Sequence, residues 1–564
     1  MRILVACLTA AAVVGTGLVA GGSADAVTNG NTAVQAPTDY IVLHAVGSGS
    51  AATEAAVKAA GGTVVSTNND LGYVVARSSS TGFVKQVDAA PGVIGAARNR
   101  VVGEAPKAKQ ASKNAIEKMT LLAGKSKSGT RHGGGSVTAE PLADLQWDMK
   151  LIDATAKGSY AKQKGSKKVL VGVIDTGIDG SHPDIKANFD AKLSRNFTTD
   201  MPDIDGPCEV ASCVDPANVD DNEHGTHVAS TIGSPINGLG IAGVAPNVTL
   251  VNIRAGQDSG YFFLKPTLDA LTYAGKIGVD VVNMSYYTDP WLYNCLDNPA
   301  DSPAEQQEQR VVREATQRAL DFARGHGVLP IAAEGNGATD LGKPVTDNTS
   351  PDYPVDAPKP RTVNNSCITV PTESRGVVAV SSVGRSTRKA YYSDYGIEQT
   401  DVSAPGGDAY EGPGGTRDIT GTVLAALPAH LAAEFGYLNP DGTPNTPAVV
   451  QSCKGSVCGY YQYLQGTSMA APHAVGVASL IVSEYGYRDH HNGGLTLTPR
   501  ATESKLLSSA AEHACPTPRT YHYTRILLDG TVVQADHTCE GPKYKNGFYG
   551  RGIVNAKAAV SGRL

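Results

Sequence analysis

The chain contains 564 residues, about four times the commonest size of a single domain, so we expect more than one folding unit. Hydrophobic residues make up 41% and charged residues 18%, a globular composition that excludes a disordered chain. Asp and Glu (54) outnumber Lys and Arg (48), which gives a net charge of −6, and no long basic run occurs. Binding to nucleic acid or to an anionic membrane surface is therefore not expected.

The first residues are typical of a secretory signal peptide, which we assign to residues 1–26. Met1-Arg2 gives a short positive start, residues 3–20 are almost wholly apolar, and Ala24-Asp25-Ala26 has the small-x-small pattern of a cleavage site. A membrane anchor is the alternative, because about 18 apolar residues just span a bilayer. The glycines of this stretch and the cleavage pattern favour a secreted, extracellular protein without a stable membrane anchor.

Residues 39–103 form the first predicted folding unit. Its strands are expected at 40–44, 63–66, 72–76 and 93–102, and its helices at 51–60 and 81–89. The order β-α-β-β-α-β is that of a small ferredoxin-like α+β domain. Residues 104–140 then lose periodicity and are rich in Lys, Ser, Gly and Ala, which predicts an exposed linker.

From residue 141 onward, predicted strands and helices alternate. Continuous apolar runs indicate buried strands at 169–174, 249–253, 279–284, 328–333 and 377–383. Helices are expected at 224–232, 267–277, 305–324 and 468–485. Strands joined by crossover helices predict an α/β fold, in which a parallel sheet carries helices on both faces.

The cysteines indicate disulfides. Of the nine cysteines, Cys7 lies in the signal, and the remaining eight are an even number in an oxidising compartment. Eight cysteines allow 105 pairings, of which Cys208–Cys213 and Cys453–Cys458 are the best supported, because short loops close easily there. Zinc binding is the alternative, and the missing C-x₂-C spacing counts against it.

Three segments place reactive side chains at strand ends or helix starts, where open parallel sheets gather their active sites. Asp175 follows the strand at 169–174, His224 opens one predicted helix, and Ser468 opens another. Taken singly, they are interpreted as a strand-end carboxylate, a core histidine and an N-cap serine. A metal pair of His224 and His227 is a further alternative, but the Glu of the H-E-x-x-H pattern is missing.

Taken together, the segments Asp175-Thr-Gly, His224-Gly-Thr-His and Gly466-Thr-Ser-Met-Ala-Ala-Pro-His resemble those of the subtilisin-like serine proteases. The resemblance covers residues 141–564 and implies a subtilisin-like catalytic domain with a three-layer parallel-sheet fold. It implies that Ser468 is the nucleophile, that His224 is its general base, and that Asp175 orients the imidazole.

The resemblance also implies further positions at the substrate. Asn336 matches the family's oxyanion-hole amide, with Gly335 beside it, and Glu334 replaces the small residue usual there. Three interpretations of Glu334 stay open: it tightens the pocket, favours basic substrates or points to solvent. A polypeptide substrate would lie as an added strand between Asp258-Ser259-Gly260 and Ser285. The alternative for these two segments is a plain strand end and its loop, and the sequence after Ser285 departs from the family pattern.

Asp184 and Asn237 match the family's high-affinity calcium site, in the segments His182-Pro-Asp and Asn237-Gly-Leu-Gly-Ile. A plain loop is the alternative, because the ligand expected near the mature N-terminus is not evident. Catalysis itself is expected to need no cofactor. The inserted stretches at about 195–220, 287–310 and 407–464 have no assigned task.

By the same resemblance, we expect a monomeric secreted endopeptidase made as a zymogen. Residues 39–103 would be its inhibitory propeptide, and the linker at 104–140 would contain the processing site. The alternative for the first unit is an unrelated exported domain. For the whole chain, the alternatives are a non-catalytic binding protein and an esterase or transferase on the same scaffold.

Overall fold

The computed structural model describes residues 37–99, 140–353 and 358–564. The predicted signal peptide at 1–26 lies outside the described residues. So does the predicted linker at 104–140, except for Glu140.

The N-terminal unit is an antiparallel sheet with the strand order β2-β3-β1-β4. Its elements are β1 (Thr38–His44), α1 (Ser50–Ala59), β2 (Thr63–Asn68), β3 (Tyr73–Ser78), α2 (Phe83–Asp88) and β4 (Val93–Arg98). They follow the order expected from the sequence. Alternate residues of β1 face opposite sides, so Tyr40 and Val42 pack with the helices of the unit while Ile41 and Leu43 pack against the larger domain.

The larger domain is built on a seven-stranded sheet with the order β13-β12-β9-β8-β5-β7-β6, in which the paired strands are parallel. The strands are β5 (Leu170–Ile174), β6 (Arg195–Asn196), β7 (Thr249–Arg254), β8 (Val281–Met284), β9 (Leu329–Ala333), β12 (Val378–Val383) and β13 (Val402–Pro405). Each of the five strands expected from an apolar run is present, and the α/β fold is confirmed.

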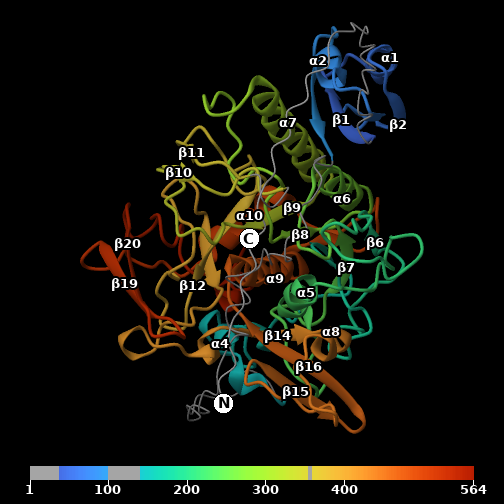
Figure 1. The fold of residues 1–564 in the computed structure, drawn as a ribbon. Coiled ribbons are helices and arrows are strands. Elements are labelled where there is room, and N and C mark those ends of the chain that lie inside the picture. The colour runs from blue at the N-terminus through green and yellow to red at the C-terminus, as the bar shows by residue number, and fades with distance from the viewer. Residues whose placement is uncertain (1–36, 100–139, 354–357) are drawn as a thin grey trace, which may run out of the picture.

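Helices cover both faces of this sheet, as Figure 1 shows. On one side lie α5 (His224–Gly233) and α9 (Thr467–Tyr485), and on the other α6 (Leu264–Lys276) and α7 (Pro303–Gly325). Side chains of β5 alternate between the two cores: Val171 and Val173 pack with α5 and α9, while Ile174 packs toward α6. Helix α9 is buried from Thr467 to Val482, which explains its continuous apolar sequence.

Antiparallel additions surround the sheet. A three-stranded sheet comprises β14 (Val423–Leu427), β15 (Val449–Lys454) and β16 (Val457–Leu464), and a hairpin comprises β19 (Thr520–Ile526) and β20 (Val532–Thr538). The shorter elements are α4 (Trp147–Leu151), α8 (Ala429–Glu434), α10 (Pro499–Ser509), α11 (Ala556–Ala559), β10 (Thr346–Asp347), β11 (Arg361–Thr362), β17 (Tyr487–Arg488) and β18 (Leu495–Thr496). The three-stranded sheet of β14, β15 and β16 lies within the inserted stretch at 407–464.

Four disulfides close loops of the larger domain. Cys208–Cys213 and Cys453–Cys458 are the two pairs predicted from the sequence, and both are confirmed. The other two are Cys295–Cys367 and Cys515–Cys539. In the part of the chain that the structure describes, no helix is long and apolar enough to cross a membrane.

Candidate active site

A cleft with a volume of about 430 Å³ lies where several strands of the parallel sheet end. The residues that follow β5, β8 and β9 line it: Thr176, Ser285 and Glu334. His224 at the start of α5 and Ser468 at the start of α9 line it as well. Open parallel sheets bind their ligands at this edge.

Asp175 and His224 form a buried pair. Asp175 directly follows β5, and His224 is the first residue of α5. The Nδ1 atom of His224 lies 2.7 Å from Oδ1 of Asp175, which also accepts a hydrogen bond from the backbone N–H of Thr176 at 2.8 Å. A carboxylate on Nδ1 fixes the tautomer of the ring, so Nε2 is the nitrogen that exchanges a proton.

Two glycines let β5 and α5 approach closely enough for this pair. A Cβ on Gly225 would lie 2.0 Å from the carbonyl oxygen of Gly177. A Cβ on Gly177, whose φ is +147°, would lie 2.4 Å from the carbonyl oxygen of Val219. Both obstacles are backbone atoms, so rotation of a side chain cannot relieve the contact. Packing therefore requires the glycines of Asp175-Thr-Gly and His224-Gly-Thr.

Asp220 joins the same two elements. Its buried carboxylate accepts hydrogen bonds from Oγ1 of Thr176 at 3.0 Å, and from the backbone N–H and Oγ1 of Thr226 at 2.9 and 2.5 Å. Oγ1 of Thr176 accepts in turn from the backbone N–H of Gly225 at 3.0 Å. Burial raises the pKa of Asp220 above its ordinary value. Sequence analysis did not single out this residue, although it stands shortly before His224.

Ser468 is the second residue of α9, and Ser285 holds its main chain. The hydroxyl of Ser285 donates to the carbonyl oxygen of Ser468 at 3.1 Å and accepts from Nδ2 of Asn283 at 2.9 Å. Oγ of Ser468 lies 3.5 Å from the carbonyl oxygen of Ser285. The helix start places this hydroxyl near the positive end of the α9 dipole.

Thr467 orients the side-chain amide of Asn336. Oδ1 of Asn336 accepts from the backbone N–H and from Oγ1 of Thr467 at 2.9 and 3.0 Å. The same Oγ1 accepts from the backbone N–H of Gly335 at 3.1 Å. Because Oδ1 has these donors, Nδ2 is the end of the amide that acts as a donor at the cleft, which Asn336 lines. Sequence analysis named Asn336 and Gly335 but missed the hydroxyl that fixes them.

Glu334 is buried, so the interpretation that it points to solvent is wrong. Its side chain is 0% exposed, and Oγ1 of Thr400 donates to Oε1 at 2.6 Å. Burial raises the pKa of Glu334 well above its ordinary value, which favours the uncharged form of the carboxyl.

Asp394 supports the loop that carries Asn336. Its carboxylate accepts from the backbone N–H of Thr339 at 2.7 Å, and its own N–H donates to the carbonyl oxygen of Gly335 at 2.9 Å. A Cβ on Gly335, whose φ is +124°, would lie 2.2 Å from Oδ2 of Asp394. Burial raises the pKa of Asp394 to about 7. No local sequence pattern connects this residue to a loop so far away in the chain.

The predicted substrate edge at Asp258-Ser259-Gly260 is a tight turn, not an extended strand. The N–H of Gly260 donates to the carbonyl oxygen of Gln257 at 2.9 Å, and φ of Gly260 is +85°. The N–H and Oγ of Ser259 both donate to Oδ1 of Asp205, at 2.9 and 2.6 Å. Gly260 and Ser285 line the cleft. A role of Ser259 in substrate binding stays a prediction, and the hydrogen bonds to Asp205 compete with it.

The residues after Ser285 give the cleft an aromatic wall. The ring of Tyr286 stacks on Phe262, with centroids 4.1 Å apart and planes inclined by 2°. Asp289 holds the same segment, because its carboxylate accepts from the N–H of Phe262 at 2.6 Å and its N–H donates to the Phe262 carbonyl at 2.8 Å. Tyr287 and Tyr293 extend the wall. This wall is where the sequence departs from the family pattern.

His227 does not pair with His224 around a metal. Its Nε2 lies 3.2 Å from the carbonyl oxygens of both Val423 and Gln462. The ring is buried, and burial lowers the pKa of His227 to about 3. His227 is therefore a neutral core residue that links α5 to the three-stranded sheet.

Asp184 and Asn237 lie together, but Asp184 already has hydrogen-bond donors. Its carboxylate accepts from Nδ2 of Asn237 at 3.0 Å, from the N–H of Ile241 at 3.0 Å and from the hydroxyl of Tyr461 at 3.1 Å. Oδ1 of Asn237 accepts from the N–H of Leu239 at 2.8 Å. Calcium at these two residues stays a prediction, and an ion would have to displace these donors.

Sequence comparisons place the domain among known proteases. The sequence model of the Subtilase family matches residues 166–550. "Subtilisin DY" of Bacillus licheniformis is 29% identical over 406 residues, which are 72% of this chain and 96% of that protein. A "Thermophilic serine proteinase" of Bacillus sp. (strain AK1) is 28% identical over 323 residues, which are 57% of this chain and 54% of that protein. The chain therefore spans about half the length of the second relative.

A comparison with solved structures shows the same fold. The epidermin leader peptide processing serine protease of Staphylococcus aureus superposes with a TM-score of 0.58 at 18% identity. The match covers 93% of this chain and 98% of that chain.

Proposed function

Because this chain belongs to the subtilase family and is a serine peptidase that hydrolyses peptide bonds, we propose that it is a secreted endopeptidase using a triad of Ser468, His224 and Asp175. We further propose that it is made as a zymogen that processes itself. The signal-like residues 1–26 support export. A monomeric state stays a prediction.

The hydrogen bond between His224 and Asp175 is the observation that carries the proposed mechanism. Oγ of Ser468 attacks the carbonyl carbon of the substrate while Nε2 of His224 takes the hydroxyl proton. Asp175 stabilises the resulting imidazolium through Nδ1, at the observed distance of 2.7 Å. His224 then gives its proton to the leaving amine, and an acyl group remains on Ser468. Water, deprotonated by the same nitrogen, releases the acid product.

Asn336 supports the same mechanism. The oxygen of the substrate carbonyl becomes negatively charged as the bond to Ser468 forms, and an amide donor aimed at it lowers the barrier. Thr467 holds Oδ1 of Asn336, so Nδ2 is pre-oriented for that oxygen. Catalysis of this kind needs no cofactor.

The position of the N-terminal unit supports the zymogen proposal. Its sheet packs against α6 and α7, as Figure 1 shows. Polar contacts surround the apolar centre: Arg98 pairs with Glu308 at 3.3 Å, and the hydroxyl of Tyr73 donates to Asp269 at 2.9 Å. The sheet is thus covered by its own helices on one face and by the larger domain on the other.

The chain leaves this unit close to the cleft. Asn99 directly follows β4, and its Oδ1 accepts from the backbone N–H of Lys265 at 2.9 Å. Lys265 is in the first turn of α6, shortly after the cleft residue Phe262. A segment that leaves from Asn99 therefore begins near the cleft, as an inhibitory propeptide requires.

The triad is tested by active-site labelling. A fluorophosphonate probe forms a covalent bond only with an activated serine. We expect stoichiometric labelling and peptide hydrolysis in the wild type, and neither in Ser468→Ala. Ser483→Ala changes another serine of α9 and should keep both activities. Labelling and wild-type turnover in purified Ser468→Ala would refute the assignment.

Self-processing is tested by mass spectrometry of the wild type and of Ser468→Ala, each expressed alone in a protease-deficient host. We expect the wild type to yield a fragment that starts within residues 104–140. The variant should remain uncut from about Val27. A cut at the same bond in the variant would show that another protease does the processing.

A further inference from the structure

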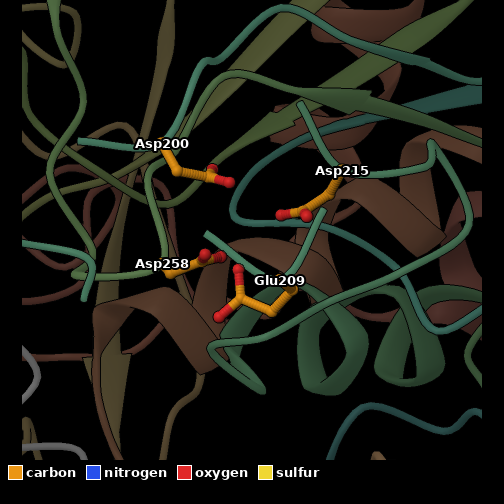
Figure 2. Close-up of side chains that lie close together, drawn as sticks. All are labelled: Asp200, Glu209, Asp215 and Asp258. Atoms are coloured by element: carbon orange, nitrogen blue, oxygen red, sulfur yellow. The ribbon is translucent and has the colours of Figure 1, made fainter. Parts of the chain in front are cut away.

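The inserted stretch at 195–220 brings acidic side chains together beside the cleft, away from the catalytic pair. Asp200, Glu209 and Asp215 come from this stretch, and Asp258 comes from the turn at the cleft edge. Figure 2 shows their carboxylates converging on one space between them. One oxygen of each lies within 4.8 Å of the others. We call these four residues the acidic cluster.

One buried cation partly balances the cluster. Arg254 is 0% exposed and contacts Asp215 at 2.8 Å and Asp258 at 2.6 Å, through one oxygen of each carboxylate. Asp200 lies farther from it, at 3.7 Å. Asp205, a fifth carboxylate nearby, accepts from Ser259. A single guanidinium therefore lies within 4 Å of three of these carboxylates, and the group of five keeps an excess of negative charge.

The carboxylate of Asp200 is buried without a hydrogen-bond donor. The residue is 2% exposed, and among the described residues neither of its oxygens accepts a hydrogen bond. Oδ2 of Asp258 is also buried, and it accepts no hydrogen bond from the described residues. Burying an ionised carboxylate without donors is costly, and proteins offset the cost with a paired charge or a metal ion.

We propose that Asp200, Glu209, Asp215 and Asp258 bind one calcium ion that fastens the inserted loop to the edge of the cleft. Calcium takes six to eight oxygen ligands at about 2.3–2.6 Å, so oxygens on opposite sides of it are about 4.6–5.2 Å apart. The four oxygens lie within 4.8 Å of one another, close enough to surround one such ion. Magnesium needs a smaller octahedral site, with ligands at about 2.0–2.1 Å. Glu209 is exposed, which gives the ion a route of entry.

This cluster differs from the environment of Asp184. The Asp184 carboxylate accepts hydrogen bonds from N–H and O–H donors, whereas the Asp200 carboxylate accepts none among the described residues and lies among other carboxylates, with Arg254 at 3.7 Å. At Asp184, a cation would have to compete with hydrogen-bond donors. In the acidic cluster, a cation would reduce the electrostatic repulsion between the carboxylates. The acidic cluster is therefore the stronger candidate.

Calcium in the cluster would act on the substrate edge. Asp258 starts the turn that includes Gly260, and its carbonyl oxygen accepts from Nδ2 of Asn222 at 2.6 Å. Asn222 stands two residues before His224. On the other side, the N–H of Asp200 donates to the carbonyl oxygen of Cys213, which the disulfide ties to Cys208. One ion thus connects the disulfide loop, the cleft edge and the approach to α5.

The test uses the full chain with Ser468→Ala, which prevents self-digestion, after treatment with a chelator and dialysis. Calcium chloride is titrated into this protein and heat is measured, and magnesium chloride is titrated separately. The same titrations are repeated with two variants in this background. Asp200→Asn keeps the shape of the side chain, and Glu209→Gln changes an exposed position and carries little risk to folding. Asp203→Asn is the matched control, because it removes an exposed charge from the same loop outside the cluster.

We expect the parent and Asp203→Asn to bind calcium equally, and magnesium more weakly. Glu209→Gln should bind calcium about tenfold less tightly, and Asp200→Asn should lose this site. If the parent binds two ions, Asp200→Asn should lose one and Asp184→Asn the other. Calcium should also raise the thermal midpoint of the parent and protect the bond after Glu209 from a Glu-specific protease.

The proposal fails if the parent binds no calcium. It also fails if Asp200→Asn and Glu209→Gln bind calcium as the Asp203→Asn control does. If Asp200→Asn does not fold, the affinity of Glu209→Gln decides the result. Loss of all calcium binding in Asp184→Asn, with unchanged binding in Asp200→Asn, would place the ion elsewhere and overturn the proposal.

Discussion

Helix α9 and the N-terminal unit both pack against the parallel-sheet domain, but their interfaces differ. α9 is buried from Thr467 to Val482, and its apolar side chains form part of the largest hydrophobic cluster of the domain. The N-terminal unit contributes an apolar centre that includes Ile41 and Leu43, within a rim of charges. In that rim, Lys276 pairs with Asp70 at 2.6 Å, and both side chains are about half exposed. Water can solvate such a rim after separation, whereas the surface of α9 cannot be exposed without losing the core. The first interface is permanent, and the second is suited to release.

The strongest test of the permanent interior is Gly225→Ala. The added Cβ would lie 2.0 Å from the carbonyl oxygen of Gly177, so α5 must move away from β5. We expect a loss of about 3 kcal/mol or more in the free energy of unfolding, measured with guanidinium in the Ser468→Ala chain. Gly233→Ala, in the same helix, is the control. Its Cβ would meet the end of the Leu250 side chain at 3.1 Å, and we expect a change within about 1 kcal/mol. Equal losses in both variants would contradict the close-approach argument.

Thr467→Val, at the start of α9, tests whether a buried hydroxyl affects catalysis separately from the stability of the fold. Valine keeps the volume but loses the hydroxyl that contacts Asn336 and Gly335. We expect kcat to fall about 10²-fold with little change in KM, because the amide loses its orientation for the transition state. Steady-state kinetics on a peptide substrate measure this effect. Thr467→Ser keeps the hydroxyl and should recover most of the rate. An unchanged kcat in the valine variant would show that Asn336 does not need this support.

The pH dependence of unfolding tests the buried histidine of α5. Burial lowers the pKa of His227 from 6.5 in the unfolded chain to about 3, so between these values the unfolded state binds more protons. The contribution to stability is present above pH 6.5 and is lost as the pH falls toward 3, at up to about 1.4 kcal/mol per pH unit. Urea unfolding at pH 4 to 7 should show a shallower slope for His227→Gln than for the wild type. His491→Asn changes an exposed histidine and should leave the slope unaltered.

The smallest effect is expected at the rim of the N-terminal unit. Glu308→Gln removes the charge that pairs with Arg98; the Arg98 side chain is 38% exposed and that of Glu308 5%. Because the arginine is open to solvent and a glutamine can still accept the backbone N–H of Arg98, we expect a loss of about 1 kcal/mol, so hydrogen exchange at the amides of β1 and β4 should become about fivefold faster. Exchange at β5 should stay unchanged. Asp321→Asn, an exposed position on the same helix, is the control. Equally faster exchange in β5 would show that the two interfaces unfold as one unit.

The sequence predicts the permanent interior well because its signals are local. Residues 169–174 and 468–485 are apolar runs whose length and composition indicate a buried strand and a buried helix, and both elements lie there. The hydrogen bond between Asp175 and His224 agrees with the roles that the sequence motifs imply for these two residues. Disulfides across short loops, such as Cys208–Cys213, follow from spacing alone.

Other features of the site and of the insertions depend on contacts between residues that are distant in the sequence, and these could not be predicted from local patterns. The environment of Glu334 is set by Thr400, 66 residues away, so no local pattern tells burial from exposure. The turn at Ser259 depends on Asp205 in an insertion, which a family resemblance does not cover. Asp200 and Asp258 lie on opposite sides of β7 in the sequence and come together only through the fold. The antiparallel strands within 407–464 were not expected, because the resemblance treats that stretch as extra.

The position of Asn99 affects how long the N-terminal unit stays in place. While the chain is continuous, the unit is held near its binding surface on α6 and α7 at an effective concentration in the millimolar range. The connecting chain sets this value, and the bulk protein concentration does not. A charged rim of modest strength then suffices to keep it bound. Once that connection is cut, the same interface competes with dilution. Occupancy of this surface then becomes a function of protein concentration, so a dilute protein would lose the unit while a concentrated one would keep it.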